Sequence, residues 1–95
     1  MRIVVSPEAR EDIDQLYAYL ARDSPAAADH ILARIIEVLD LLASGQFEGR
    51  RVTLRDGQIV HGWAVPPYRV YYRKIADEFQ VVRVYHQARR PIEKP

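Results

Sequence analysis

The C-terminal half of the chain carries its clearest alternation of apolar and polar positions. Residues 63–75 and 79–90 are rich in valine, tyrosine and phenylalanine, and residues 76–78 between them are typical of a turn. Side chains of a strand alternate between its two faces. On the first segment, one face carries Tyr68, Val70 and Tyr72, and the other face carries Arg69, Tyr71 and Arg73. On the second segment, one face carries Val82 and Val84, and the other face carries Val81, Arg83 and Tyr85. We therefore expect an antiparallel hairpin with one face suited to a hydrophobic core and one face of arginine and tyrosine.

The N-terminal half has the periodicity of two helices. Each helix begins at a serine followed by a proline, Ser6-Pro7 and Ser24-Pro25, which is the pattern of an N-cap and a first helical residue. Apolar residues then recur every three or four positions. This spacing predicts a first helix to about Arg22 and a second from Pro25 to Ser44, with Gly45 just beyond its end. The short connection predicts that the two helices pack antiparallel.

The remaining segments complete an α+β fold. Residues 2–5 form a short β-type run, and residues 46–58, with three arginines beside glycines, are typical of an irregular surface loop. Residues 59–65 alternate weakly and predict a strand that ends at Pro66-Pro67. The predicted order is β-α-α-β-β-β, a helix hairpin packed on a mostly antiparallel sheet. The pattern leaves the place of the first strand in the sheet open.

Length and charge narrow the class of protein. The 95 residues suit one domain, and the polar, proline-containing end predicts that the last five residues are mobile. The net charge is +1, but residues 1–45 hold four arginines and eight acidic residues, whereas residues 46–95 hold ten basic and five acidic residues. This asymmetry indicates two faces with different partners. With no cysteine, no membrane-length apolar run and no signal-peptide pattern, we expect a soluble cytoplasmic protein.

The sequence offers little for metal or covalent chemistry. His30, His61 and His86 lack the spacing of a zinc site, and there is no glycine-rich phosphate loop, so we expect no metal and no cofactor. His86 is the one candidate acid or base, because it ends a predicted strand shortly before Arg89 and Arg90 and could act in phosphodiester cleavage. The alternative is a strand-end histidine that hydrogen-bonds to the backbone, and the local sequence favours this alternative.

The arginine and tyrosine face is a candidate binding surface. Its members are Arg69, Tyr71, Arg73, Arg83 and Tyr85. Arginine with stacking aromatic rings is typical of a nucleic-acid surface, but the same face equally suits an acidic peptide or plain solvent. Trp63 alternates in register with Val65, which favours a core or partner-covered position over a catalytic one.

The order and spacing of these motifs resemble the ParE branch of the ParE/RelE toxin superfamily. The resemblance rests on four segments: Ser6 to Ala21, Ser24 to Ala28, Pro67 to Arg73 and Val82 to Arg89. It spans about residues 3–90 and implies the same α+β fold. It also implies a toxin of a type II toxin–antitoxin pair, which forms a hetero-oligomer with a small ParD-like antitoxin whose C-terminal segment wraps it.

The resemblance is compatible with two activities and with an inactive form of the toxin fold. ParE-type toxins are described as poisons of DNA gyrase, whereas toxins of RelE type cleave mRNA on the ribosome. The nuclease pattern needs lysines that this chain lacks, since its only lysines are Lys74 and Lys94, and it has no tyrosine after Tyr85. We therefore expect a gyrase poison that acts by binding. The alternatives are the endoribonuclease and an inactive toxin-fold interaction module.

The site residues implied for these activities lie on the hairpin and just after it. For contact with the target or the antitoxin they are Arg69, Tyr71, Arg73, Arg83, Tyr85, Arg89, Arg90 and Trp63. For a nuclease, His86 would be the acid or base, and Arg69 and Arg89 would hold the phosphate.

Overall fold

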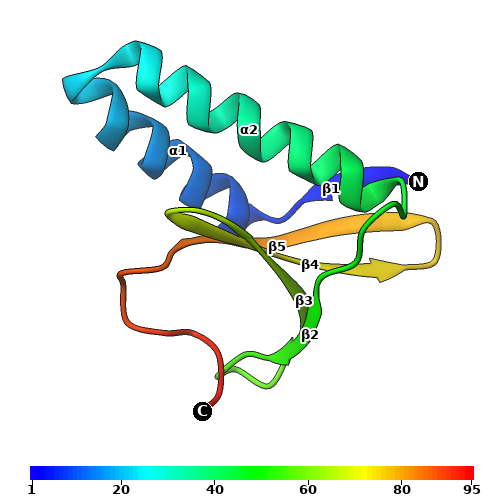
Figure 1. Ribbon diagram of the computed structural model, residues 1–95. Coiled ribbons are helices and arrows are strands. Elements are labelled where there is room, and N and C mark those ends of the chain that lie inside the picture. The colour runs from blue at the N-terminus through cyan, green and yellow to red at the C-terminus, as the bar shows by residue number, and fades with distance from the viewer.

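Two antiparallel helices cover one face of a five-stranded sheet in the computed structural model, which describes residues 1–95 (Figure 1). The elements are β1 (Arg2–Val5), α1 (Pro7–Asp23), α2 (Pro25–Ala43), β2 (Arg50–Thr53), β3 (Ile59–Val65), β4 (Tyr68–Ile75) and β5 (Glu78–His86). The strand order is β1-β5-β4-β3-β2, with β1 parallel to β5 and every other pair antiparallel. The predicted α+β class and helix hairpin are confirmed, and β1 takes the sheet edge beside β5.

Serine side chains begin both helices, as their sequence pattern predicts. The Ser6 hydroxyl accepts a hydrogen bond from the Ala9 N–H at 3.0 Å. Ser24 does the same for Ala27 at 3.1 Å, and its own N–H donates to the last turn of α1. A single residue therefore ends one helix and starts the next, which forces the chain to reverse. Gly45 follows α2 with a φ of 82°, the left-handed conformation that favours glycine after a helix.

The main core lies between the helices and the sheet. Its fully buried centre includes Ile35 and Leu42 of α2 and Tyr72 and Phe79 of the sheet. The rings of Tyr72 and Phe79 stack with centroids 4.6 Å apart. The cluster consists of Ala9, Leu16, Ile35, Val38, Leu39, Leu42, Val65, Tyr68, Val70, Tyr72, Phe79, Val81 and Val84.

A β-bulge changes which residues of β5 face this core. Tyr71 pairs with Arg83 but Tyr72 pairs with Val81, so one extra residue stands in β5. Val81 and Val84 consequently both join the main core, while Val82 packs on the opposite face. The strict alternation expected from the sequence, which grouped Val82 with Val84, is wrong because a bulge reverses the faces of the residues beyond it.

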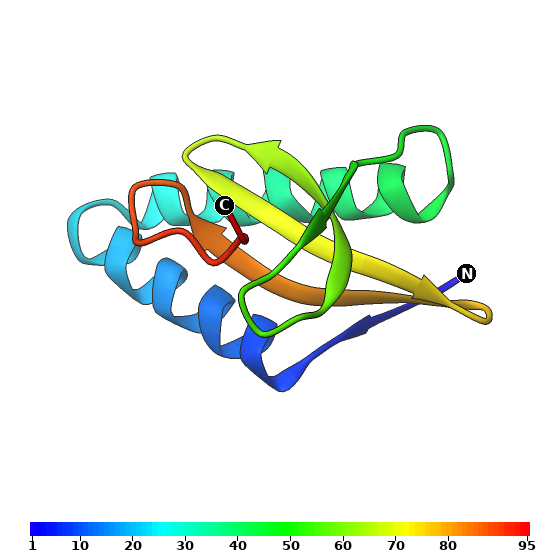
Figure 2. The ribbon, with the colours of Figure 1, turned by 90° about the horizontal axis from the view of Figure 1, so that it is seen from below.

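The sheet face away from the helices carries a second, smaller hydrophobic cluster. It consists of Val52, Leu54, Val60, Tyr71, Val82 and Tyr85, with Ile92 packed against it. Figure 2 shows this face, with the C-terminal segment crossing it. The sequence predicts a loop over residues 46–58, but Arg50–Thr53 form β2 against β3. β2 is short and carries one buried side chain, Val52, so its pairing depends on the rest of the sheet.

The C-terminal segment is held against β2. The Arg55 N–H donates to the Ile92 carbonyl at 2.7 Å, and the Lys94 N–H donates to the Thr53 carbonyl at 2.8 Å. Leu54 and Glu93 form an isolated antiparallel bridge. The sequence alone predicts that the last five residues are mobile, and it gives no sign of these contacts with β2 and the turn after it.

Candidate functional site

The start of β4, the end of β5 and the C-terminal residues line a basic pocket of about 500 Å³. Four basic side chains and one acidic side chain line it: Arg55, Arg69, Arg89, Lys94 and Glu93. Tyr71, Tyr85 and His86 also line the pocket. We call this site the basic pocket. It brings together the three residues considered for a nuclease, Arg69, His86 and Arg89, and both tyrosines of the predicted binding face.

The two tyrosines are part of the second core. Tyr71 and Tyr85 are 4% and 9% exposed, so their rings cannot act as open stacking platforms for bases. The Tyr85 hydroxyl donates to the Arg90 carbonyl at 2.7 Å, and the Tyr71 hydroxyl donates to Glu93 at 2.7 Å. Burial, together with the hydrogen bond to Glu93, raises the pKa of Tyr71 well above the ordinary tyrosine value. Both tyrosines therefore support the pocket from below, and Tyr71 keeps its proton near neutral pH.

His86 is held at the end of β5 by its ring. Its Nδ1 atom accepts a hydrogen bond from the Ala88 N–H at 3.0 Å, and Tyr68 packs edge-on with ring centroids 5.1 Å apart. This is the backbone-bonded strand-end histidine that the sequence favoured. Because Nδ1 is an acceptor, Nε2 is the nitrogen left to exchange a proton with a ligand.

Arg89 and Arg69 supply the positive charge of the basic pocket. Arg89 is exposed, and its guanidinium lies 4.7 Å from the centre of the Tyr85 ring, a cation–π contact that orients it. Arg69 is half-buried on β4, and its Nε atom lies 3.8 Å from a carboxylate oxygen of Glu93. A planar guanidinium suits a carboxylate or a phosphate, so the pocket can bind an anion.

Glu93 is a pocket residue that the sequence analysis missed. Its carboxylate accepts the Tyr71 hydrogen bond and lies 3.4 Å from Arg50 and 3.8 Å from Arg69. The sequence analysis passed over it, because it stands in a polar tail predicted to be mobile. A signal was available only in the pattern of an apolar residue, Ile92, directly before an acid in a basic half of the chain.

Other predicted site residues lie outside the basic pocket. Arg83 forms a bidentate pair with Asp12 of α1, with Nε–Oδ2 and Nη2–Oδ1 distances of 2.7 and 2.9 Å. Arg73 donates to Gln80 and Gln58 at 2.8 and 3.3 Å. Both arginines are half-buried and already paired with side chains of this chain.

Trp63 and Arg90 also stand apart from the pocket. Trp63 packs against the main core on the helix side of β3, with Phe47 at 5.7 Å between ring centroids, so it does not share the arginine face. Arg90 is exposed and contributes its carbonyl to Tyr85. The predicted single surface is thus divided between the basic pocket, structural ion pairs and the opposite side of the sheet.

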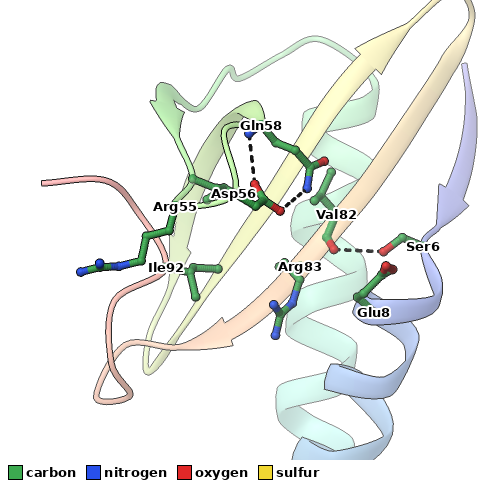
Figure 3. Close-up of a pocket in the computed structure, with 9 residues that line it drawn as sticks. Ser6, Glu8, Arg55, Asp56, Gln58, Val82, Arg83 and Ile92 are labelled. Atoms are coloured by element: carbon green, nitrogen blue, oxygen red, sulfur yellow. Dashed lines mark hydrogen bonds between the residues drawn. The ribbon is translucent and has the colours of Figure 1, made fainter.

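A smaller pocket of about 290 Å³ lies between the start of α1 and the loop after β2 (Figure 3). Two acidic and two basic residues, Glu8, Asp56, Arg55 and Arg83, contribute to its lining, so its charges are mixed. Asp56 accepts hydrogen bonds from the Gln58 side chain at 2.7 Å and from its N–H at 3.1 Å, which lower the pKa of the carboxyl. This arrangement shapes the turn between β2 and β3.

The structure contains no metal-binding cluster and no membrane-length apolar helix. No group of three or more histidine, aspartate or glutamate side chains is placed to hold a metal ion. Neither helix is both long and apolar enough to cross a lipid bilayer.

Comparison with known proteins identifies the family. Residues 3–91 match the family described as the ParE toxin of the type II toxin–antitoxin system parDE. Toxin RelE3 of Caulobacter vibrioides is 26% identical over 88 residues, which cover 93% of this chain and 96% of that protein. A solved structure of the chromosomal ParDE TA system from P. aeruginosa has the same fold, with a TM-score of 0.72 and 22% identity over 90% of this chain and 95% of that one. Since the family match spans nearly the whole chain, this protein belongs to the ParE toxin family of type II toxin–antitoxin systems.

Proposed function

We propose that the protein inhibits growth by binding and poisoning DNA gyrase, and that a cognate antitoxin silences it by covering the basic pocket. The observation that carries this proposal is the pocket itself, where Arg69 and Arg89 present positive charge above buried, immobile tyrosines. Arginines held on a well-packed support are typical anchors of protein interfaces. The family description and the relative solved as a ParDE system support a small antitoxin as the partner.

The chemistry of the pocket favours binding over catalysis. Both tyrosine hydroxyls donate to internal acceptors, and the raised pKa of Tyr71 keeps it protonated. Glu93 neutralises part of the Arg69 charge in the free chain, which opposes entry of a phosphate. A carboxylate from an antitoxin can replace Glu93 without a change in charge balance.

The test is a supercoiling assay with purified gyrase and plasmid DNA. We expect the wild-type protein to reduce supercoiling and to trap double-strand breaks, with relief by the antitoxin. Arg69→Glu and Arg89→Glu should each weaken inhibition at least about tenfold, since reversal of an interface charge of this kind costs over 1 kcal/mol. Arg10→Glu, an exposed reversal on α1, is the matched control. Unchanged inhibition by folded pocket variants would contradict the proposal.

A ribosome-dependent endoribonuclease is the second candidate, because Arg69, His86 and Arg89 line one pocket. In this reading the Nε2 atom of His86 moves the proton while the arginines hold the phosphate. It predicts cleavage of mRNA in the ribosomal A site that His86→Ala abolishes. A folded wild-type protein that neither inhibits gyrase nor cleaves mRNA would instead be the inactive interaction module.

A further inference from the structure

The chain binds a short peptide segment of its own at the edge of the sheet. Residues 91–94 lie antiparallel to the end of β2, with one side chain in the second core and one in a ring of basic and hydroxyl groups. We propose that this is an exchangeable docking site for an extended, acidic segment of a partner protein, in which an apolar residue is followed by a carboxylate. The free chain fills the site with Ile92 and Glu93.

The backbone contacts define the geometry of the ligand. Two main-chain hydrogen bonds join the segment to the last residue of β2 and the chain just after it: Lys94 N–H donates to the Thr53 carbonyl, and Arg55 N–H donates to the Ile92 carbonyl. They flank the antiparallel Leu54–Glu93 bridge. This is the pattern by which an extended peptide adds to an exposed sheet edge, so the site accepts any segment able to supply the same backbone groups.

The side-chain contacts define its sequence preference. Ile92 packs against the second hydrophobic cluster, so the first subsite requires an apolar side chain. Glu93 accepts from the Tyr71 hydroxyl and pairs with Arg50 and Arg69, so the second requires a carboxylate. Tyr71 is 4% exposed and cannot turn to solvent, which means that its hydroxyl needs an acceptor from whatever occupies the site.

The internal segment is held by polar contacts and a single half-buried apolar side chain. Besides the two main-chain bonds, it is fixed by the Glu93 contacts and by a hydrogen bond from Arg55 Nε to the Pro91 carbonyl at 2.9 Å. Ile92 is only half-buried, and Pro91, Lys94 and Pro95 are exposed. Segments with so few buried contacts open at low cost compared with global unfolding. A partner segment of the same pattern therefore competes with the tail for one site.

The identification of the partner as the antitoxin rests on the proposed function. The docking site itself does not depend on it. Silencing would begin when an acidic antitoxin segment displaces the tail and takes over the contacts with Arg50, Arg69 and Tyr71. The basic pocket overlaps this site, since Arg69, Tyr71, Ile92 and Glu93 belong to both, so the same exchange would cover the surface proposed for gyrase.

The test uses the full chain and a synthetic peptide with the sequence of residues 89–95. A double variant, Ile92→Ser with Glu93→Gln, is designed to release the tail, because it removes the apolar side chain and the carboxylate that hold the tail in place. Binding is followed by amide chemical shifts of Arg50, Thr53 and Arg55 in NMR spectra. Because a tethered segment competes at an effective concentration in the millimolar range, we expect the peptide to bind the released variant at least about tenfold more tightly than the wild type.

Matched controls separate docking from general charge attraction. The same peptide carrying Glu93→Gln should bind the released variant about tenfold more weakly, since it cannot offer a charged acceptor. The protein variant Lys74→Gln, altered at an exposed lysine near the far end of β4, should behave as the wild type. Equal binding of the two peptides, equal binding by wild type and released variant, or no saturable shift at about 5 mM peptide would each overturn the proposal. Since neither gyrase nor antitoxin is present, failure of the gyrase assay leaves this result intact.

Discussion

Asp12 is the residue whose replacement tests the internal structure most directly. Its side chain is 8% exposed, between α1 and the free edge of β5. It accepts two hydrogen bonds from Arg83, at 2.7 and 2.9 Å, and one from the buried Val84 N–H at 3.0 Å. The carboxylate thus closes a sheet edge that β1 leaves uncovered beyond Val81. Asp12→Ala removes all three bonds at once.

The expected loss follows from these contacts. A buried N–H left without an acceptor costs about 1–3 kcal/mol. The ion pair is neither fully exposed nor fully buried, because the Arg83 side chain is 28% exposed and can partly rehydrate. Loss of the ion pair therefore costs about 1–2 kcal/mol. The sum is about 3 kcal/mol, which for a chain of this size lowers Tm by about 15 °C.

The assay is urea unfolding followed by circular dichroism, with thermal unfolding as a second measurement. Asp14→Ala is the matched control, an exposed aspartate on the same helix that should change stability by less than about 0.5 kcal/mol. Arg83→Met combined with Asp12→Ala should cost less than the sum of the single changes, since each removes the same pair. If Asp12→Ala were no more destabilising than Asp14→Ala, the reasoning about this buried contact would be refuted.

Three further predictions concern backbone and ionisation. Gly49→Ala should cost at least about 2 kcal/mol in urea unfolding, because the added Cβ would overlap the Gly62 carbonyl oxygen; a change under about 0.5 kcal/mol would contradict this contact. Ser24→Ala should lose about 1 kcal/mol, since the hydroxyl caps α2, and no loss would show the cap to be dispensable. The pKa of Tyr71 is raised above 10.0 by burial and by Glu93, so its contribution to stability is complete below pH 10.0 and falls as the pH rises further. Tyr71→Phe should therefore lose less unfolding free energy above pH 10.0 than the wild type does. An identical dependence of stability on pH in the two proteins would contradict this prediction.

The local elements were accessible from the sequence because short-range chemistry determines them. Serine caps, the proline after each, and the spacing of apolar residues specified both helices, and Gly45 marked the end of the second. The hairpin of β4 and β5 followed from its composition and alternation. The α+β class then followed from the order of helices and strands, since a hairpin of amphipathic helices needs a sheet face to bury its apolar side.

The sequence also indicated part of the candidate site, though not its construction. Arg69, Arg89 and His86 were named, and they line one pocket. Arg83 was assigned to the same surface, but its partner Asp12 is 71 residues away in the sequence, and no local pattern links them. Glu93 was missed for the same reason, because its contacts with Arg50 and Tyr71 exist only after the tail has folded back onto β2.

By itself, then, the sequence determined where helices begin and end, the hairpin, the fold class and the basic character of the C-terminal half. Only the tertiary structure decided the bulge that moves Val82 to the second face, the pairing of β2, and which arginines are free to bind. The physical reason is that these features depend on contacts between segments distant in the chain. Burial and pairing, which decide whether a charged or aromatic side chain is structural or available, are set by those contacts rather than by residue type.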